Sequence, residues 1–494
     1  APDAALPGDD LPDAAAIPAW DDLTPPEREL FCRHMEVYAA AVDEIDQSLG
    51  RIMDRLEALG ELDDTIIVVT SDNGGTAEGG RTGTRSYFAQ FGTGVALPDD
   101  WVRDVPRDPE LIGGPQVFSQ YPAGWARVSN TPFRSFKSST YEGGVHAPLI
   151  LSWPAAPERA EAGLRDQYLF VSDLAPTILD LVDVSREAPA AAPQVDGQSI
   201  RPVLTDRRGP ARSRQYFECV GTRALYDDGL KVVSPVPPTK GEGGAGGTWE
   251  LYDLRQDPTE TTDLAARNPD RVRAMAERWR EEAWRNTVFP LDDDGGLHLA
   301  RPATEMRLAL PVSLSPFRPP LERFRSAKLT VLRSFRVEID LDLHAGGSGT
   351  LVAHGDQGGG YGLYLEDARL HLAYNAYGHM HRASSGPLEP GRRRVVLRVD
   401  EETGLRWSLT CEVDEVEAVR MDDVPMLLGM APFTGISVGY DYGGPVDWER
   451  AQRRGSSPLT DSTILSLVYV PGPRSPFDPT VINEIDGQVL HSAD

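Results

Sequence analysis

Cysteine is scarce in this chain of 494 residues, which contains only Cys32, Cys219 and Cys411. Their wide separation fits neither a disulfide framework nor a zinc site built from cysteine pairs. Basic residues are also few, because 49 Lys and Arg face 76 Asp and Glu and give a formal net charge of −27. This balance argues against a nucleic-acid partner, which would require a basic surface.

Long apolar runs are missing as well. No segment approaches the roughly 18 apolar residues that span a bilayer, so we expect no membrane partner. The first 22 residues are acidic and rich in proline, unlike a signal peptide, and are interpreted as a boundary loop. The sequence does not indicate a cellular compartment.

A strong helix signal begins at Thr24, where Pro25 and Glu27 complete a capping box. An apolar stripe then runs with spacings of three and four to Gly60, and we expect it to pack on a sheet. It consists of Tyr38, Val42, Ile45, Leu49, Ile52, Leu56 and Leu59. The next apolar run, residues 66–69, is typical of a strand covered on both faces. A helix followed by a buried strand indicates an α/β fold.

The sequence SDNGG, residues 71–75, follows this strand directly. Ligands of open α/β sheets collect beyond the carboxyl ends of the strands. The carboxylate of Asp72 and the amide oxygen of Asn73 are hard ligands suited to Ca²⁺ or Mg²⁺. The alternative interpretation is an ordinary Asn-Gly turn.

A second stretch, WARVSNTPFRSFKSSTYEGGVHAPLILSWPA at residues 125–155, makes the pattern specific. SDNGG after a strand, then NTPFR, a lysine, TYEGG and PLILSWP, resembles the catalytic domain of the sulfatase family in the alkaline-phosphatase superfamily. Further similar pieces are SDLAPTILDL, DGQSIRPVL, YFECVGTRALYDDGLK and WELYDLRQDPTETTDLA. The likeness covers about residues 15–290 and is greatest to long bacterial arylsulfatases. It implies the C-terminal part of a mixed-sheet α/β domain.

The resemblance also implies roles for individual residues. Asp72 and Asn73 match two ligands of the active-site cation, usually Ca²⁺ and less commonly Mg²⁺. Lys137 matches the lysine that contacts the sulfate, a role that suits an ammonium beside developing negative charge. Glu142 and the glycines after it would shape the turn behind this lysine. His146 is either a supporting hydrogen-bond donor or a purely structural residue. The implied substrate is a small-molecule or carbohydrate sulfate ester.

The chain departs from the family pattern in its nucleophile. Sulfatases convert a Cys or Ser in the motif Cys/Ser-x-Pro/Ala-x-Arg to formylglycine, and the 494 residues contain no such motif. Cys219 begins CVGTR, but Gly221 replaces the Pro or Ala, and we interpret it as a decoy. The paired metal-binding aspartates after the family's first strand are missing too. We therefore expect a sulfatase without its N-terminal catalytic half, inactive alone and exposing part of an apolar sheet.

The pattern changes after residue 266. An amphipathic helix is predicted there, with Val272, Met275, Trp279 and Trp284 on one face. From about residue 325 to 475, period-two alternation and short Gly/Asp turns predict an antiparallel β-sandwich, similar to the concanavalin-like sandwich of long sulfatases. Its apolar row is Phe335, Val337, Ile339, Leu341 and Leu343, opposite Arg336, Glu338, Asp340 and Asp342.

Several aromatic residues of the predicted sandwich could stack on a sugar, although aromatic residues in strands more often belong to a core. They are Tyr361, Tyr364, Tyr374, Tyr377 and Trp407.

The predicted domains are a partial catalytic domain at 23–295, a linker at 296–324, the sandwich at 325–475 and a tail at 476–494. Two function classes stay open. One is a sulfuric ester hydrolase whose nucleophile lies outside this chain. The other is a non-catalytic protein, either a degenerate sulfatase or a carbohydrate-binding accessory module, and phosphoester hydrolysis is a related alternative.

Overall fold

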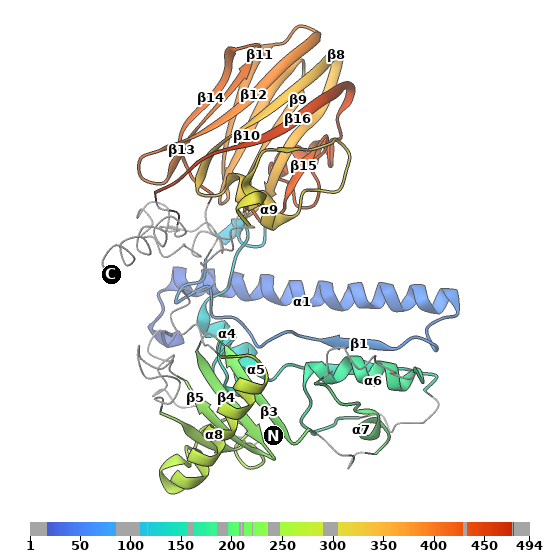
Figure 1. Ribbon diagram of the computed structural model, residues 1–494, viewed down its shortest axis with the longest axis vertical. Coiled ribbons are helices and arrows are strands. Elements are labelled where there is room, and N and C mark those ends of the chain that lie inside the picture. The colour runs from blue at the N-terminus through green and yellow to red at the C-terminus, as the bar shows by residue number, and fades with distance from the viewer. Residues whose placement is uncertain are drawn as a thin grey trace. The chain divides into compact units, whose positions relative to one another are not determined.

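A computed structural model of the protein describes residues 17–84, 109–115, 117–156, 163–184, 196–206, 209, 212–219, 221–235, 248–289, 305–427, 432–476 and 478. The chain forms two compact units (Figure 1). The first lies within Ala1–Leu23, Tyr38–Ala77 and Ala123–Gly295, and the second within Thr24–Val37, Glu78–Pro122 and Gly296–Asp494. Within the described residues, no helix combines the length and apolar character that crossing a membrane requires.

The long helix α1 occupies Pro25–Leu59 and begins and ends where the sequence predicts. The Glu27 carboxylate accepts hydrogen bonds from the Thr24 amide (2.8 Å) and hydroxyl (2.7 Å), which is the Glu27 half of the predicted capping box. At the other end, Gly60 takes a φ of +74°, which a residue with a Cβ rarely adopts. The Gly60 and Glu61 amides then donate to the Glu57 and Leu56 carbonyls, a Schellman arrangement that closes the helix.

The apolar stripe of α1 is not buried, and the prediction that it packs on a sheet is wrong. Val42, Ile45 and Ile52 are 49%, 65% and 57% exposed. The described helix buries only Phe31 and His34, near its start. Spacing identified the helix because periodicity is local, but it could not say whether a partner covers the stripe.

Strand β1 (Ile67–Thr70) pairs only with β2 (Leu149–Ser152), in antiparallel register, among the described residues. Its side chains are half-buried or exposed, so the prediction of a strand covered on both faces is wrong. On β2, Leu149 and Ile150 are exposed. The expectation that this chain presents part of an apolar sheet to solvent is therefore met. The short helices of this unit are α4 (Ala123–Ser129), α5 (Glu142–Val145), α6 (Leu174–Leu181) and α7 (Arg201–Thr205).

A four-stranded antiparallel sheet completes the first unit, with α8 (Pro269–Arg285) packed against it (Figure 1). Its strands follow chain order: β3 (Arg214–Cys219), β4 (Thr222–Asp227), β5 (Leu230–Ser234) and β6 (Glu250–Asp253). Met275 and Trp279 of α8 are buried as predicted, and the Trp279 indole donates to the Phe217 carbonyl at 2.8 Å. Trp284 is 66% exposed, so its predicted place on the buried face is wrong, and Ala283 is buried instead.

The second unit contains the predicted antiparallel β-sandwich, whose two sheets share one strand (Figure 1). The 24-residue strand β8 (Arg333–Asp356) pairs through its first half with β12 and β16, and through its second half with β9 and β15. Between the halves lie Gly346 and Gly349, both with positive φ. Glycine tolerates this conformation, which lets β8 pass from one sheet to the other.

The remaining strands extend the two sheets on either side of β8. They are β7 (Val312–Ser313), β9 (Gly359–Glu366), β10 (Arg369–Ala376), β11 (His379–Pro387), β12 (Gly391–Glu402), β13 (Arg406–Val413), β14 (Val416–Pro425), β15 (Ile436–Val438) and β16 (Thr460–Arg474). Two short helices, α9 (Arg323–Thr330) and α10 (Trp448–Arg454), belong to the same unit. The fold is therefore an α/β region followed by an all-β sandwich, as predicted.

The predicted alternation in β8 is confirmed residue by residue. Phe335, Val337, Ile339, Leu341 and Leu343 are all buried in the sandwich core. The opposite row is exposed or half-buried and forms surface ion pairs such as Arg336–Glu338 at 2.6 Å. Four of the five aromatic residues considered for sugar stacking lie in the core cluster, namely Tyr361, Tyr374, Tyr377 and Trp407, and for these the structural interpretation is the right one. Tyr364 lies outside this cluster and lines a pocket instead.

We expect Leu341→Ala to destabilise the sandwich by about 2–5 kcal/mol, because it leaves a cavity at a fully buried position. Leu465→Ala is the matched control, since the same atoms are removed from a side chain that is 51% exposed. Urea unfolding, followed by hydrogen exchange of β12 amides, reports the stability of this unit. Equal loss in the two variants would contradict the assigned core.

Candidate functional site

Hydrogen bonds within the SDNGG turn stabilise its conformation at the end of β1. The Ser71 hydroxyl donates to the Asn73 carbonyl at 2.9 Å, and the Asn73 side-chain amide donates to the Gly74 carbonyl at 2.7 Å. The Asn73 side-chain oxygen makes no hydrogen bond with the described part of the chain. Asp72 is exposed, and its carboxylate is likewise without a protein partner among the described residues. Both oxygen donors are therefore available to a ligand.

The glycines of SDNGG and TYEGG are in direct contact, and this contact leaves no space for a side chain. The Gly74 amide donates to the Gly144 carbonyl at 3.1 Å. A Cβ on Gly74 would lie 1.8 Å from the Gly143 carbonyl oxygen, and one on Gly143 would lie 2.2 Å from the Arg134 carbonyl oxygen. Only glycine fits at these positions, so the two motifs must pack together as backbone against backbone.

Asn130 of the NTPFR segment contacts the SDNGG turn as well. Its buried side-chain oxygen accepts from the Gly75 amide at 2.7 Å, and its amide donates to the Ser135 carbonyl at 2.9 Å. The Lys137 amide in turn donates to the Gly75 carbonyl at 3.0 Å. The main chain of Lys137 is thereby fixed beside the SDNGG turn, and its side chain is half-buried. The three motifs that the sequence singles out form one interlocked group of loops.

Glu142 is buried and belongs to a charged group that sequence analysis missed. The Lys231 ammonium lies between two carboxylates, 2.7 Å from Glu142 Oε1 and 3.0 Å from Glu260 Oε1. Glu260 Oε2 also accepts from the Glu142 amide at 2.7 Å. Lys231 and Glu260 are fully buried. The signal that could have identified Lys231 is a lone lysine beside two valines in a strand, since an isolated buried charge demands a partner.

The charges of this group shift one another's titration. Burial alone would raise the pKa of Glu142, but the Lys231 ammonium and the His146 ring lower it to about 2. Burial raises the pKa of Glu260 to about 7, with Lys231 opposing and the Glu142 carboxylate reinforcing the shift. One ammonium cannot fully compensate two buried carboxylates, so the second carboxylate is the one that holds a proton more readily.

His146 lies at the outer edge of this group. Its ring nitrogen Nδ1 is 2.9 Å from Glu142 Oε2, and its ring stacks on Phe133 with centroids 4.3 Å apart. The side chain is about half exposed. His146 thus connects the buried Glu142 carboxylate to the surface near the motif loops.

A second network ties the NTPFR segment to β6. The Tyr141 and Tyr252 hydroxyls both donate to Glu250 Oε2, at 2.5 and 2.7 Å. The Arg134 guanidinium donates to the Tyr252 hydroxyl at 2.9 Å and lies 4.1 Å from the Tyr141 ring centroid. Burial raises the pKa of both tyrosines, so they remain hydroxyl donors. This network anchors the loop that precedes Lys137 on the four-stranded sheet.

Cys219 ends β3 and opens the hairpin to β4. Its carbonyl accepts from the Thr222 hydroxyl at 2.7 Å, and Gly221 takes a φ of +85°. Burial and the Glu218 carboxylate raise the pKa of the Cys219 thiol, while Lys137 lowers it in part. A thiol with a raised pKa is a poor nucleophile. The interpretation of CVGTR as a decoy stays a prediction, which rests on Gly221 in place of the Pro or Ala.

A divalent cation finds only part of a coordination shell here. Asp72 and Asn73 supply hard oxygen donors of the kind that Ca²⁺ prefers, up to about three of the six to eight that it takes. Across the residues that the structure describes, no three or more His, Cys, Asp and Glu side chains are grouped to hold a metal ion. The donor chemistry of the turn fits such an ion, and the other ligands would have to come from elsewhere.

Comparison with known proteins shows what this chain is similar to. Residues 7–184 match the family model described as Sulfatase. An uncharacterized sulfatase of Schizosaccharomyces pombe is 32% identical over 296 residues, which are 57% of this chain and 49% of that protein. An arylsulfatase of Klebsiella aerogenes is 25% identical over 175 residues, 35% of each chain. N-acetylgalactosamine-6-O-sulfatase of Bacteroides thetaiotaomicron is 27% identical over 248 residues, 47% of this chain and 39% of that protein. The chain spans less than half the length of each of these three relatives.

Replacement of Gly74 tests the contact between the motif loops. We expect Gly74→Ala to displace the SDNGG turn and lower stability by several kcal/mol, because its Cβ would overlap the Gly143 carbonyl. Gly50→Ala is the matched control: Gly50 lies inside α1 with nothing within 4 Å of an added Cβ, so alanine should stabilise by about 0.5–1 kcal/mol. Thermal unfolding of both variants measures the difference. A Gly74→Ala protein as stable as wild type would contradict the close approach.

The raised pKa of Glu260 predicts a pH dependence. A carboxyl group whose folded pKa lies near 7 instead of near 4.5 contributes stability at pH 5 that is lost as the pH rises through 7. We expect the free energy of unfolding of the wild type to fall between pH 5 and 8 by up to about 3 kcal/mol more than that of Glu260→Gln. Urea unfolding at both pH values measures this difference, with the exposed Glu57→Gln as control. Parallel pH profiles for wild type and Glu260→Gln would exclude the assignment.

Proposed function

We propose that the first unit carries the C-terminal part of a sulfatase active site, in which Lys137 binds the sulfate group of an ester. The observation that carries this proposal is the interlock of SDNGG, NTPFR and TYEGG. Three separate motifs meet through main-chain hydrogen bonds, and Lys137 is attached to the same turn as Asp72 and Asn73. An ammonium at this place would stabilise negative charge as the S–O bond breaks.

Asp72 and Asn73 are proposed as two ligands of a divalent cation, Ca²⁺ in preference to Mg²⁺. When bound, such an ion would supply positive charge to the sulfate oxygens. The protein's own contribution is to hold the two oxygen donors on a turn that cannot shift, because its glycines are packed against α5. Glu142 and His146 would act on the site only indirectly, by fixing the position of α5.

The nucleophile is proposed to come from outside this chain. No Cys/Ser-x-Pro/Ala-x-Arg motif occurs in the sequence, and Cys219 begins a hairpin that lacks the Pro or Ala. The proposed partner is an N-terminal segment of the same protein that contributes this motif and the paired aspartates. The exposed apolar residues of β2 are consistent with a sheet that continues into such a segment.

The proposed substrate class is an aryl or carbohydrate sulfate ester. One relative is named N-acetylgalactosamine-6-O-sulfatase, which favours a sulfated sugar. Loops such as residues 88–118 are proposed to set the choice of substrate, although their sequence carries no readable code, and most of this loop lies outside the described residues.

A non-catalytic role is the second candidate, and the missing nucleophile motif is the observation that favours it. In that case the protein is a degenerate sulfatase, or a module whose sandwich binds carbohydrate. The two candidates differ in one respect that can be measured. Only the first gains sulfatase activity when the missing motif is supplied.

We expect the purified chain to show no hydrolysis of 4-nitrophenyl sulfate above a Lys137→Ala control, since no residue in it can become the formylglycine. Co-production with a segment that carries the nucleophile motif should yield activity that rises with added Ca²⁺. Lys137→Ala should then reduce kcat by about 10²-fold or more, and Lys328→Ala is the control for loss of another half-buried lysine. Turnover by the chain alone, or full activity of the Lys137→Ala complex, would overturn the proposal.

A further inference from the structure

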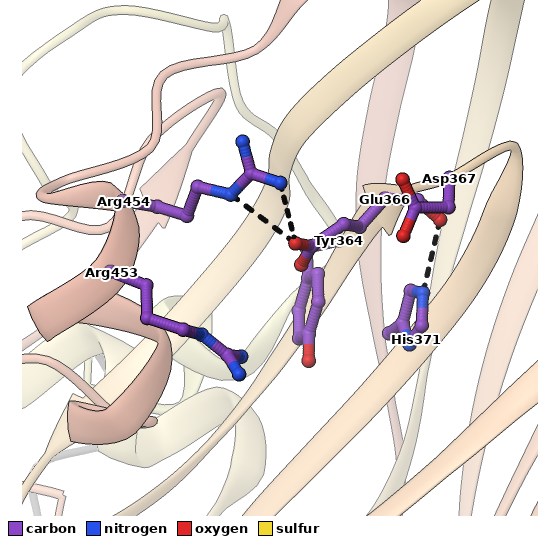
Figure 2. Close-up of a pocket in the computed structure, with 6 residues that line it drawn as sticks. All are labelled: Tyr364, Glu366, Asp367, His371, Arg453 and Arg454. Carbon is purple, nitrogen blue, oxygen red and sulfur yellow. Dashed lines mark hydrogen bonds and ion pairs between the residues drawn. The ribbon is translucent and has the colours of Figure 1, made fainter.

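The sandwich contains a pocket of about 540 Å³ that has no place in the sulfatase chemistry. It is lined by Tyr364 and Glu366 of β9, by Asp367 in the following turn, by His371 of β10, and by Arg453 and Arg454 of α10 (Figure 2). The volume lies within the range of small-molecule pockets, roughly 300–1,000 Å³. Its walls are polar and carry both signs of charge, so the matching ligand is hydrophilic.

Part of this wall is rigid. The Arg454 guanidinium donates to Glu366 Oε1 at 2.9 and 3.2 Å (Figure 2). The His371 ring is held at both nitrogens, since Nδ1 is 2.7 Å from the Ser384 hydroxyl and Nε2 is 3.1 Å from the Glu366 carbonyl. It lies parallel to the Tyr364 ring with centroids 5.0 Å apart. A wall fixed in this way loses little conformational freedom when a ligand binds.

A further contact to the Tyr364 ring comes from Arg450. The guanidinium of Arg450, which is itself buried, lies 3.9 Å from the Tyr364 ring centroid and donates to the Thr350 hydroxyl at 3.1 Å. Tyr364 is only 7% exposed, yet its hydroxyl makes no hydrogen bond with the described part of the chain. The hydroxyl is not one of the fully buried polar atoms without a partner in the described part of the chain, so a ligand or water in the pocket can reach it.

Two charged side chains of the pocket are also without partners. Arg453 is exposed and forms no ion pair or hydrogen bond with the described residues, in contrast to the neighbouring Arg454 (Figure 2). Asp367 is exposed and equally unpaired among them, and its φ of +51° fixes it in the turn between β9 and β10. The pocket thus presents one free guanidinium, one free carboxylate and one free hydroxyl around a fixed aromatic wall.

We propose that this pocket binds a saccharide unit that carries an anionic group, either a sulfate ester or a carboxylate. Arg453 pairs with the anion, because a guanidinium matches the paired oxygens of such groups. Asp367 and the Tyr364 hydroxyl bond to sugar hydroxyls, and the edge of the His371–Tyr364 stack faces the ring. A polyanion such as nucleic acid is disfavoured by the formal charge of −27 and by the two acidic residues in the wall. This binding does not depend on sulfatase activity.

The test is calorimetric titration of the full chain in a Lys137→Ala background, so that the proposed catalytic lysine does not contribute. The probes are N-acetylglucosamine 6-sulfate, glucuronate, unmodified N-acetylglucosamine and inorganic sulfate. We expect saturable binding of one or both anionic sugars, at least tenfold tighter than of N-acetylglucosamine or inorganic sulfate. The two anionic probes distinguish a sulfate from a carboxylate as the recognised group.

Arg453→Ala should weaken binding of the anionic sugar at least tenfold, and Asp367→Asn should weaken the sugar-dependent part. Arg392→Ala is the matched control, because Arg392 is an exposed arginine of the same sandwich that does not line the pocket. Thermal unfolding establishes that each variant is folded. Absence of saturable binding, unchanged binding by Arg453→Ala, or equal affinity for inorganic sulfate would overturn the proposal.

Discussion

The first unit depends on a buried ammonium between two carboxylates. Lys231 comes from β5, Glu260 from the segment after β6 and Glu142 from α5, so one charge holds three parts of the chain together. Because a buried charge without a partner costs several kcal/mol, none of the three can move away alone. Glu142 begins the short helix whose glycines contact the SDNGG turn, and this turn in turn fixes the main chain of Lys137. The positions of the SDNGG turn and of Lys137 thus follow from a contact in the interior.

Local patterns predicted much of the fold. The Thr24–Glu27 contact at the start of α1, the end of α1 at Gly60 and the alternation of β8 all depend on neighbouring residues, and all three are found as expected. The burial of the α1 stripe was not predictable, because it depends on whether a partner surface covers it. The prediction that Trp284 lies on the buried face of α8 is wrong for the same reason. Periodicity places this residue near the edge of that face, and the sheet does not cover the edge.

The sequence predicted the motifs of the candidate site, but not the residues that hold these motifs in place. Asp72, Asn73 and Lys137 stand out through their resemblance to the family, and their roles stay predictions. The partners of Glu142 carry no local signature, because Lys231 and Glu260 are 89 and 118 residues away in the sequence. The sandwich pocket was hidden in the same way, since α10 is distant in sequence from the β9–β10 turn. Tyr364 was noticed as a surface for stacking, whereas the structure buries its ring and leaves its hydroxyl unpartnered.

The passage of β8 through both sheets has a consequence for how the sandwich is made. Its first half is covered by β16, whose Ser466 bonds to Asp340 across 126 residues of intervening chain. During synthesis on the ribosome, β8 emerges long before that partner, so the row from Phe335 to Leu343 lacks its neighbour until β16 has left the exit tunnel. Pairings of such long range form slowly. The sandwich therefore closes late in synthesis. Until β16 has been synthesised, the apolar row of β8 lacks this neighbour and stays exposed to other chains.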